Sequence, residues 1–115
     1  MARYIVCEET ELPVGEMKLF KAGNTKVLVY HLEDGFYATQ PSCTHVLAPL
    51  SRGKIIDGHF IRCPFHHAEF DIRTGEVHQW ANFPPGIQLL NVVRSEKALK
   101  THPTMLEDGK VSVEV

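Results

Sequence analysis

The sequence has little cysteine, little net charge and no long apolar run. Its three cysteines, Cys7, Cys43 and Cys63, are an odd and sparse set, which argues against a secreted disulfide scaffold. The 12 basic residues nearly balance the 14 acidic ones, without the basic footprint of a nucleic-acid-binding protein. No run approaches the length of a membrane span, and the N-terminus turns acidic too early for a signal peptide. We therefore expect a cytoplasmic protein that binds neither nucleic acid nor membrane.

A sustained apolar period of 3.6 residues is also lacking, which disfavours amphipathic helices. Short apolar and β-branched runs predict strands instead, at Tyr4–Val6, Val27–Tyr30, Phe36–Ala38, Phe60–Ile61, Leu89–Val93 and Val111–Val115. Between them stand three Asp-Gly pairs of the kind preferred in hairpins, at residues 34–35, 57–58 and 108–109. A chain of 115 residues with this pattern predicts one all-β, mostly antiparallel domain over residues 1–115.

Two segments do not fit the strand pattern and predict loops, at about residues 41–50 and 63–70. The first contains Cys43 and His45, and the second contains Cys63 and His66. The turn predicted at residues 57–58 lies between them, so a hairpin there would bring the two loops side by side. That arrangement can assemble a site with four ligands.

The donor pattern bears on which metal such a site would hold. Structural zinc sites usually group like ligands in pairs, whereas here each loop supplies one cysteine and one histidine. A two-iron cluster with cysteines on one iron and histidines on the other suits this mixture. Zinc remains an alternative, as does a reading in which the cysteines are buried small apolar residues and the histidines ordinary loop residues.

The segments Cys43-Thr-His45 and Cys63-Pro-Phe-His66 resemble the Cys-x-His and Cys-x-x-His boxes of the Rieske ferredoxin family. The resemblance implies a small antiparallel Rieske-type β-sandwich or barrel, with a cluster-binding subdomain formed by two loops. It also implies a [2Fe-2S] cluster on Cys43, His45, Cys63 and His66. Small members of the family carry electrons from a flavoprotein reductase to a terminal oxygenase that hydroxylates aromatic substrates, and are not themselves enzymes.

Departures from the wider family predict a low reduction potential. Respiratory Rieske proteins place extra cysteines and hydroxyl donors around the cluster, and the matching positions here look like Ala48, Phe65, Ala68 and Phe70. Fewer hydrogen bonds would then stabilise the reduced cluster. The segment 94–104 looks longer than in the shortest members; it is either a partner-specific surface loop or a tolerated insertion, and we favour the insertion.

Three rival functions are weighed against this one. A Rieske oxygenase needs a further domain with a mononuclear iron site, for which the chain lacks the length. The small subunit of an assimilatory nitrite reductase and a zinc-binding interaction module remain as alternatives.

Overall fold

The computed structural model describes residues 2–42, 49–64, 68–79 and 98–115. Cys43, His45 and His66 therefore lie outside the described residues, as does the strand predicted at Leu89–Val93. The described strands are β1 (Arg3–Glu8), β2 (Met17–Ala22), β3 (Thr25–Leu32), β4 (Gly35–Thr39), β5 (Lys54–Ile56), β6 (Phe60–Arg62), β7 (Glu69–Asp71), β8 (Val77–Gln79), β9 (Thr101–His102), β10 (Thr104–Glu107) and β11 (Lys110–Glu114). Two short 3₁₀ helices accompany them, η1 (Glu9–Glu11) and η2 (Leu50–Arg52).

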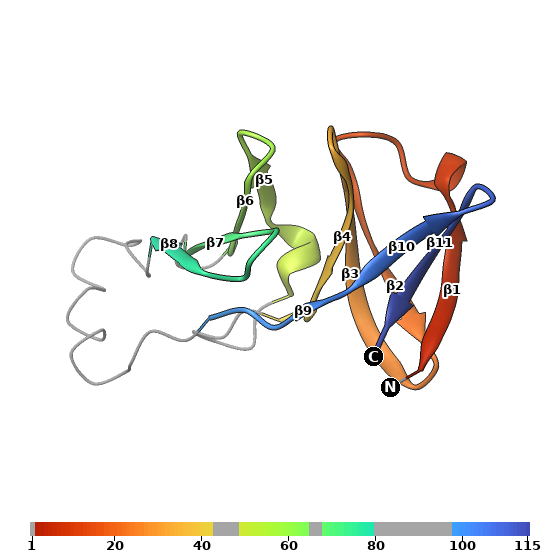
Figure 1. The fold of residues 1–115 in the computed structure, drawn as a ribbon. Coiled ribbons are helices and arrows are strands. Elements are labelled where there is room, and N and C mark those ends of the chain that lie inside the picture. The colour runs from red at the N-terminus through yellow and green to blue at the C-terminus, as the bar shows by residue number, and fades with distance from the viewer. Residues whose placement is uncertain (1, 43–48, 65–67, 80–97) are drawn as a thin grey trace.

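Two antiparallel sheets face each other and form the body of the molecule (Figure 1). One has the strand order β1-β11-β10 and the other the order β2-β3-β4-β9. A third antiparallel sheet, β5-β6-β7-β8, forms a smaller lobe on the other side of β3 and β4 (Figure 1). The prediction of an all-β antiparallel fold is confirmed, and no helix in the described ranges is long and apolar enough to cross a membrane.

Strand β3 is buried on both faces and separates two apolar cores. Val27 and Val29 belong to the core between the two sheets of the body, together with Cys7 and other residues of β1, β2, β4 and β11. Leu28, Tyr30 and Leu32 point the other way, because successive strand residues face opposite sides. They join the core between the body and the lobe, which also holds Leu50, Ile61, Cys63, Ala68, Phe70, Ile72 and Leu99.

The three predicted Asp-Gly turns are confirmed. They connect β3 to β4, β5 to β6 and β10 to β11. Asp57 and Asp108 both have positive φ, at 54° and 52°, and each is followed by a glycine with positive φ. Aspartate and glycine tolerate this conformation better than other residues, so the sequence marks these turns directly.

The described end of the segment that returns from the lobe to the body, residues 98–104, packs into the fold. Leu99 is buried, and its N–H donates to the carbonyl of Gly75 over 2.7 Å. β9 then pairs with β4, and after Pro103 the chain continues as β10 in the opposite sheet. The expectation of a tolerated insertion over residues 94–104 stays a prediction, and its described part, 98–104, contributes a buried side chain and a paired strand.

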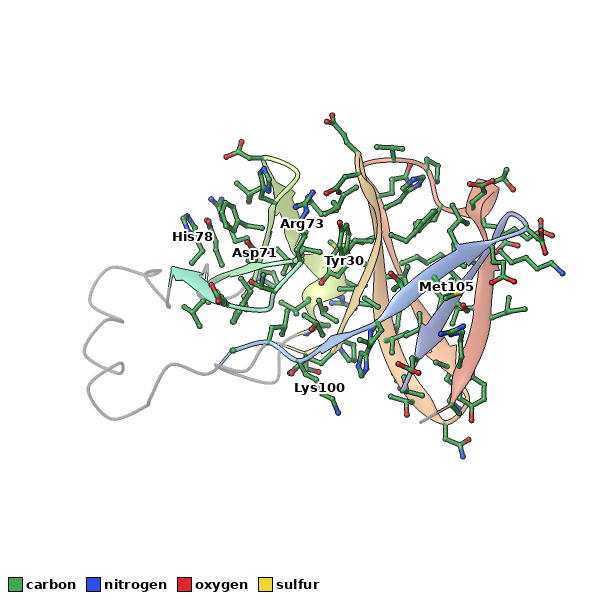
Figure 2. The ribbon with its side chains drawn as sticks, viewed as in Figure 1. Tyr30, Asp71, Arg73, His78, Lys100 and Met105 are labelled. Atoms are coloured by element: carbon green, nitrogen blue, oxygen red, sulfur yellow. The ribbon has the colours of Figure 1, made fainter. Side chains whose placement is uncertain are left out.

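Arg73 joins the lobe to the β3–β4 turn on the outside of the molecule (Figure 2). Its Nη2 lies 2.7 Å from Asp34 Oδ1, and its Nε donates to Asp34 Oδ2 over 3.1 Å. Its Nη1 donates to the carbonyl of Gly58 over 3.2 Å. The hydrogen bond from the Arg73 guanidinium lowers the pKa of Asp34 below its ordinary value. The Arg73 side chain thus links the lobe to the β3–β4 turn of the body through two hydrogen bonds to Asp34.

Candidate metal centre

Cys63 is the one predicted ligand that the structure describes. It follows β6 directly and is fully buried in the core between body and lobe. Cys43, His45 and His66 lie outside the described residues, so their placement stays a prediction. Within the described ranges, no three His, Cys, Asp or Glu side chains gather into a metal site.

The base of the second loop is closed by the β6–β7 hairpin. The N–H of Cys63 donates to the carbonyl of Ala68 over 2.8 Å, next to the paired residues Arg62 and Glu69. On the outer face, Arg62 Nε and Nη2 both donate to Glu69 Oε2, over 2.9 and 2.8 Å. The Glu69 side chain is only 7% exposed, so this ion pair is partly shielded from solvent.

The base of the first loop is closed in a similar way. The N–H of Leu50 donates to the carbonyl of Pro41 over 2.9 Å, and Ser42 and Pro49 form an antiparallel bridge. Gln40 adds a side-chain contact, because its Nε2 donates to the carbonyl of Ser42 over 2.7 Å. Ser42 and Pro49, the described residues on either side of the first loop, therefore lie next to each other in space.

The two loop bases lie side by side. Gly53, just after η2, packs so tightly on the end of β6 that a Cβ there would lie 1.9 Å from the carbonyl oxygen of Arg62. Leu50 from the first base and Cys63 and Ala68 from the second share one core. The predicted β5–β6 hairpin is present and the two loop bases share one core, whereas the meeting of the loops themselves stays a prediction.

This arrangement fits a cluster with two thiolate and two imidazole ligands. Such a ligand set sums to zero formal charge with an oxidised two-iron core, and an uncharged group is far cheaper to bury than an ion. The surroundings of Cys63 are apolar, with Leu50, Ala68 and Phe70 in the same core. An apolar shell limits the access of water to iron-bound sulfur.

Cys7 is distinguished from the candidate ligands by its surroundings. It is 6% exposed and lies in the core of the body. Burial, with a smaller contribution from Glu11, raises the pKa of the Cys7 thiol. A thiol that stays protonated is a poor metal ligand, since the thiolate is the binding form.

The histidines outside the two boxes that the structure describes have other contacts. His31 Nδ1 lies 2.6 Å from the carbonyl oxygen of Leu12, and its ring stacks on Phe36. His78 stacks on Phe60, with ring centroids 3.9 Å apart. Figure 2 shows His78 on the lobe, on the side away from the body. These two histidines therefore have structural or exposed positions away from the loop bases.

Sequence reasoning missed two residues that shape the loop bases. One is Gly53, whose close approach to β6 depends on pairing between distant segments. The other is Gln40, whose Oε1 accepts from the N–H of Lys100 over 2.9 Å while its Nε2 holds the first loop. A lone glutamine before a proline carries no local signal for such a role.

The described strands define a small antiparallel β protein in which two loop bases meet at one core, and comparison with known proteins identifies its family. Residues 2–103 match the Rieske [2Fe-2S] domain family. The chain belongs to this family, which confirms the expected fold and the expected [2Fe-2S] cofactor.

Its relatives include ferredoxin components of dioxygenase systems. The biphenyl dioxygenase ferredoxin subunit of Pseudomonas sp. (strain KKS102) is 32% identical over 94% of this chain and 87% of the relative. The ferredoxin component of the p-cumate 2,3-dioxygenase system of Pseudomonas putida is 30% identical over 96% of this chain and 83% of the relative. Among solved structures, a Sphingomonas yanoikuyae B1 ferredoxin matches with a TM-score of 0.77 at 29% identity, over 99% of both chains.

A second solved structure is titled as a complex of a reduced oxygenase and an oxidised ferredoxin in carbazole 1,9a-dioxygenase. A chain in it matches with a TM-score of 0.74 at 30% identity, over 96% of this chain and 91% of that one.

Proposed function

We propose that this protein carries single electrons from a flavoprotein reductase to a terminal ring-hydroxylating oxygenase. The cluster is held by Cys43, His45, Cys63 and His66, and the chain forms one Rieske domain over residues 1–115, with cluster loops at about 41–50 and 63–70. It acts in the cytoplasm as a carrier and is not itself an enzyme. The observation that carries the proposal is the junction of the two loop bases at buried Cys63, in a chain related to dioxygenase ferredoxins.

The rigidity of the loop bases suits electron transfer. When bound, a cluster of this type accepts and releases one electron at a time. The backbone bonds at Ala68 and Leu50, together with the Arg62–Glu69 ion pair, hold the described bases of the two loops in place. A fixed ligand frame changes little between redox states, so a small energy is needed to reorganise it. The apolar core around Cys63 excludes water from the same place.

The ligand assignment is tested by paired substitutions of buried cysteines. Cys63→Ala and Cys7→Ala each remove a buried thiol, so both lose similar packing. We expect Cys63→Ala to lose the iron and the red-brown colour, and Cys7→Ala to keep both. Iron and sulfide analysis of the purified variants measures this. Equal iron content in the two variants would show that Cys63 is not a cluster ligand.

The histidine ligands are tested by His45→Ala and His66→Ala, with the exposed His78→Ala as the control. The first two should lose the cluster, and His78→Ala should retain it. Electron paramagnetic resonance of the dithionite-reduced protein should give the low average g value of a mixed-ligand cluster. A colourless protein containing zinc would select the zinc-binding alternative, and copurification with a siroheme subunit would select the nitrite reductase alternative.

A further inference from the structure

A basic groove borders the proposed cluster site. It has a volume of about 240 Å³ and is lined by Arg52, Gly53, Lys54, Arg62, Cys63 and Pro64. Arg52 and Lys54 are exposed, and the Arg62 side chain is 36% exposed. The groove thus places three cations beside one proposed ligand.

The charges of the groove are not balanced locally. Lys54 and Arg62 are direct partners across β5 and β6, so their side chains lie on the same face of the sheet. Like charges in such a pair destabilise the sheet. Arg62 is neutralised by Glu69, but within the described part of the chain neither Arg52 nor Lys54 forms an ion pair.

The sequence around the groove supplies little compensation. Residues 43–68 contain Asp57 as their single acidic residue, and Asp57 lies in the turn at the far end of the β5–β6 hairpin. The groove is therefore a positive site on a protein whose net charge is −2.

Acidic residues gather at the opposite end of the molecule. Glu9 and Glu11 lie in η1, and the N–H of Glu9 donates to the carbonyl of Gly109 over 2.9 Å. That bond places η1 beside the β10–β11 turn, which adds Glu107 and Asp108. Figure 1 shows this turn on the side of the body away from β5–β8. The charge asymmetry can orient a charged partner during its approach.

We propose that Arg52 and Lys54 dock the carboxylate-rich face of an electron-transfer partner protein. This inference rests on the proposed function, because it assigns a partner to the same cluster site. Docking there brings the partner next to Cys63, and the negative far end of the molecule disfavours the reversed orientation. A transient partner needs only a small interface, so a few charges suffice to set its rate of association.

The test compares two double variants that each remove two positive charges. Arg52→Gln/Lys54→Gln removes them from the groove. Lys21→Gln/Lys26→Gln removes two exposed positive charges away from the groove, on β2 and β3. The probe is reduced flavodoxin, an acidic one-electron protein, mixed with the oxidised cluster protein in a stopped-flow spectrometer at low ionic strength.

We expect the groove variant to lower the second-order rate constant about tenfold and to flatten its dependence on salt. Each single substitution should lower it about threefold, and the control pair should change it by less than about twofold. Oxidation of the reduced groove variant by cytochrome c, a basic protein, should be as fast as for the unmodified protein or faster.

Equal losses in the two double variants would overturn the proposal, because net charge and not the groove would then control the rate. An unchanged rate and salt dependence in the groove variant would overturn it as well. Rapid reaction of that variant with cytochrome c in either case would leave the electron-carrier function standing. A protein that forms no cluster, or that exchanges no electron with either probe, would overturn both.

Discussion

Gly75 holds the return segment against the lobe and gives a sharp test of the packing. Its φ is +78°, and a Cβ there would lie 2.0 Å from the carbonyl oxygen of Leu99. Gly58 provides a matched control with a φ of +65° and no heavy atom within 4 Å of the corresponding Cβ position. Gly75→Ala therefore adds strain and a clash, whereas Gly58→Ala adds strain alone.

The expected magnitudes follow from these two contributions. An alanine in the left-handed region costs about 1–2 kcal/mol, and both variants carry this cost. Overpacking against Leu99 adds about 1–3 kcal/mol in Gly75→Ala only. For a domain of this size, each kcal/mol lowers the melting temperature by about 4 °C. Gly75→Ala should thus melt roughly 4–12 °C below Gly58→Ala.

Thermal melting of the cluster-loaded proteins at one heating rate measures this difference. Far-ultraviolet circular dichroism follows the sheets, and visible absorbance follows the cluster. Melting temperatures of the two variants that agree within about 2 °C would refute the reasoning, since the Leu99 carbonyl would then yield without cost.

Three further predictions follow from the same structure. The midpoint potential of the cluster should lie near the low end of the Rieske range, roughly −150 mV. The reason is that the residues matched to hydroxyl donors in other Rieske proteins lack hydroxyl groups. A clearly positive potential measured by voltammetry would contradict this prediction. Tyr30→Phe removes the 2.8 Å hydrogen bond to Thr39 Oγ1 inside the core, so the free energy of unfolding in urea should fall by about 1 kcal/mol; an unchanged value would show that the bond contributes nothing. The ion pair with Arg73 lowers the pKa of Asp34 from 3.8, so its stabilisation is present above that pH and is lost as the pH falls further. When the pH is lowered through that range, the melting temperature of Asp34→Asn should fall less than that of the unmodified protein. If the two melting temperatures instead fall in parallel, the Asp34–Arg73 ion pair does not contribute to stability.

The body of the fold is largely predictable because its strands carry their own signals. β3 has a continuous apolar and β-branched run, and the Asp-Gly pairs mark the turns on either side of the loops. β5, β7 and β8 were missed because each has only three residues and pairs through the hairpins around it. β2 was missed because Lys18 and Lys21 interrupt its apolar residues.

The family and the cofactor of the candidate site could be predicted from the sequence, but the contacts that hold its two loop bases could not. The spacing of two Cys/His boxes is a local pattern, so the family and the cofactor could be predicted from it. Gly53 packs closely on β6, and the Gln40 side chain forms hydrogen bonds with Ser42 and with Lys100. The contacts with β6 and with Lys100 join segments that are separated in the sequence. Such contacts form only in the folded chain, so they cannot be predicted from a short stretch of the sequence.

The double burial of β3 bears on attempts to transplant the cluster lobe into another scaffold. Leu28, Tyr30 and Leu32 form one wall of the lobe's interior, although they belong to a strand of the body. A graft limited to residues 41–79 would therefore expose an unfinished apolar surface and tend to aggregate. A recipient protein would have to provide a strand with large apolar side chains at alternate positions before it could accept the lobe.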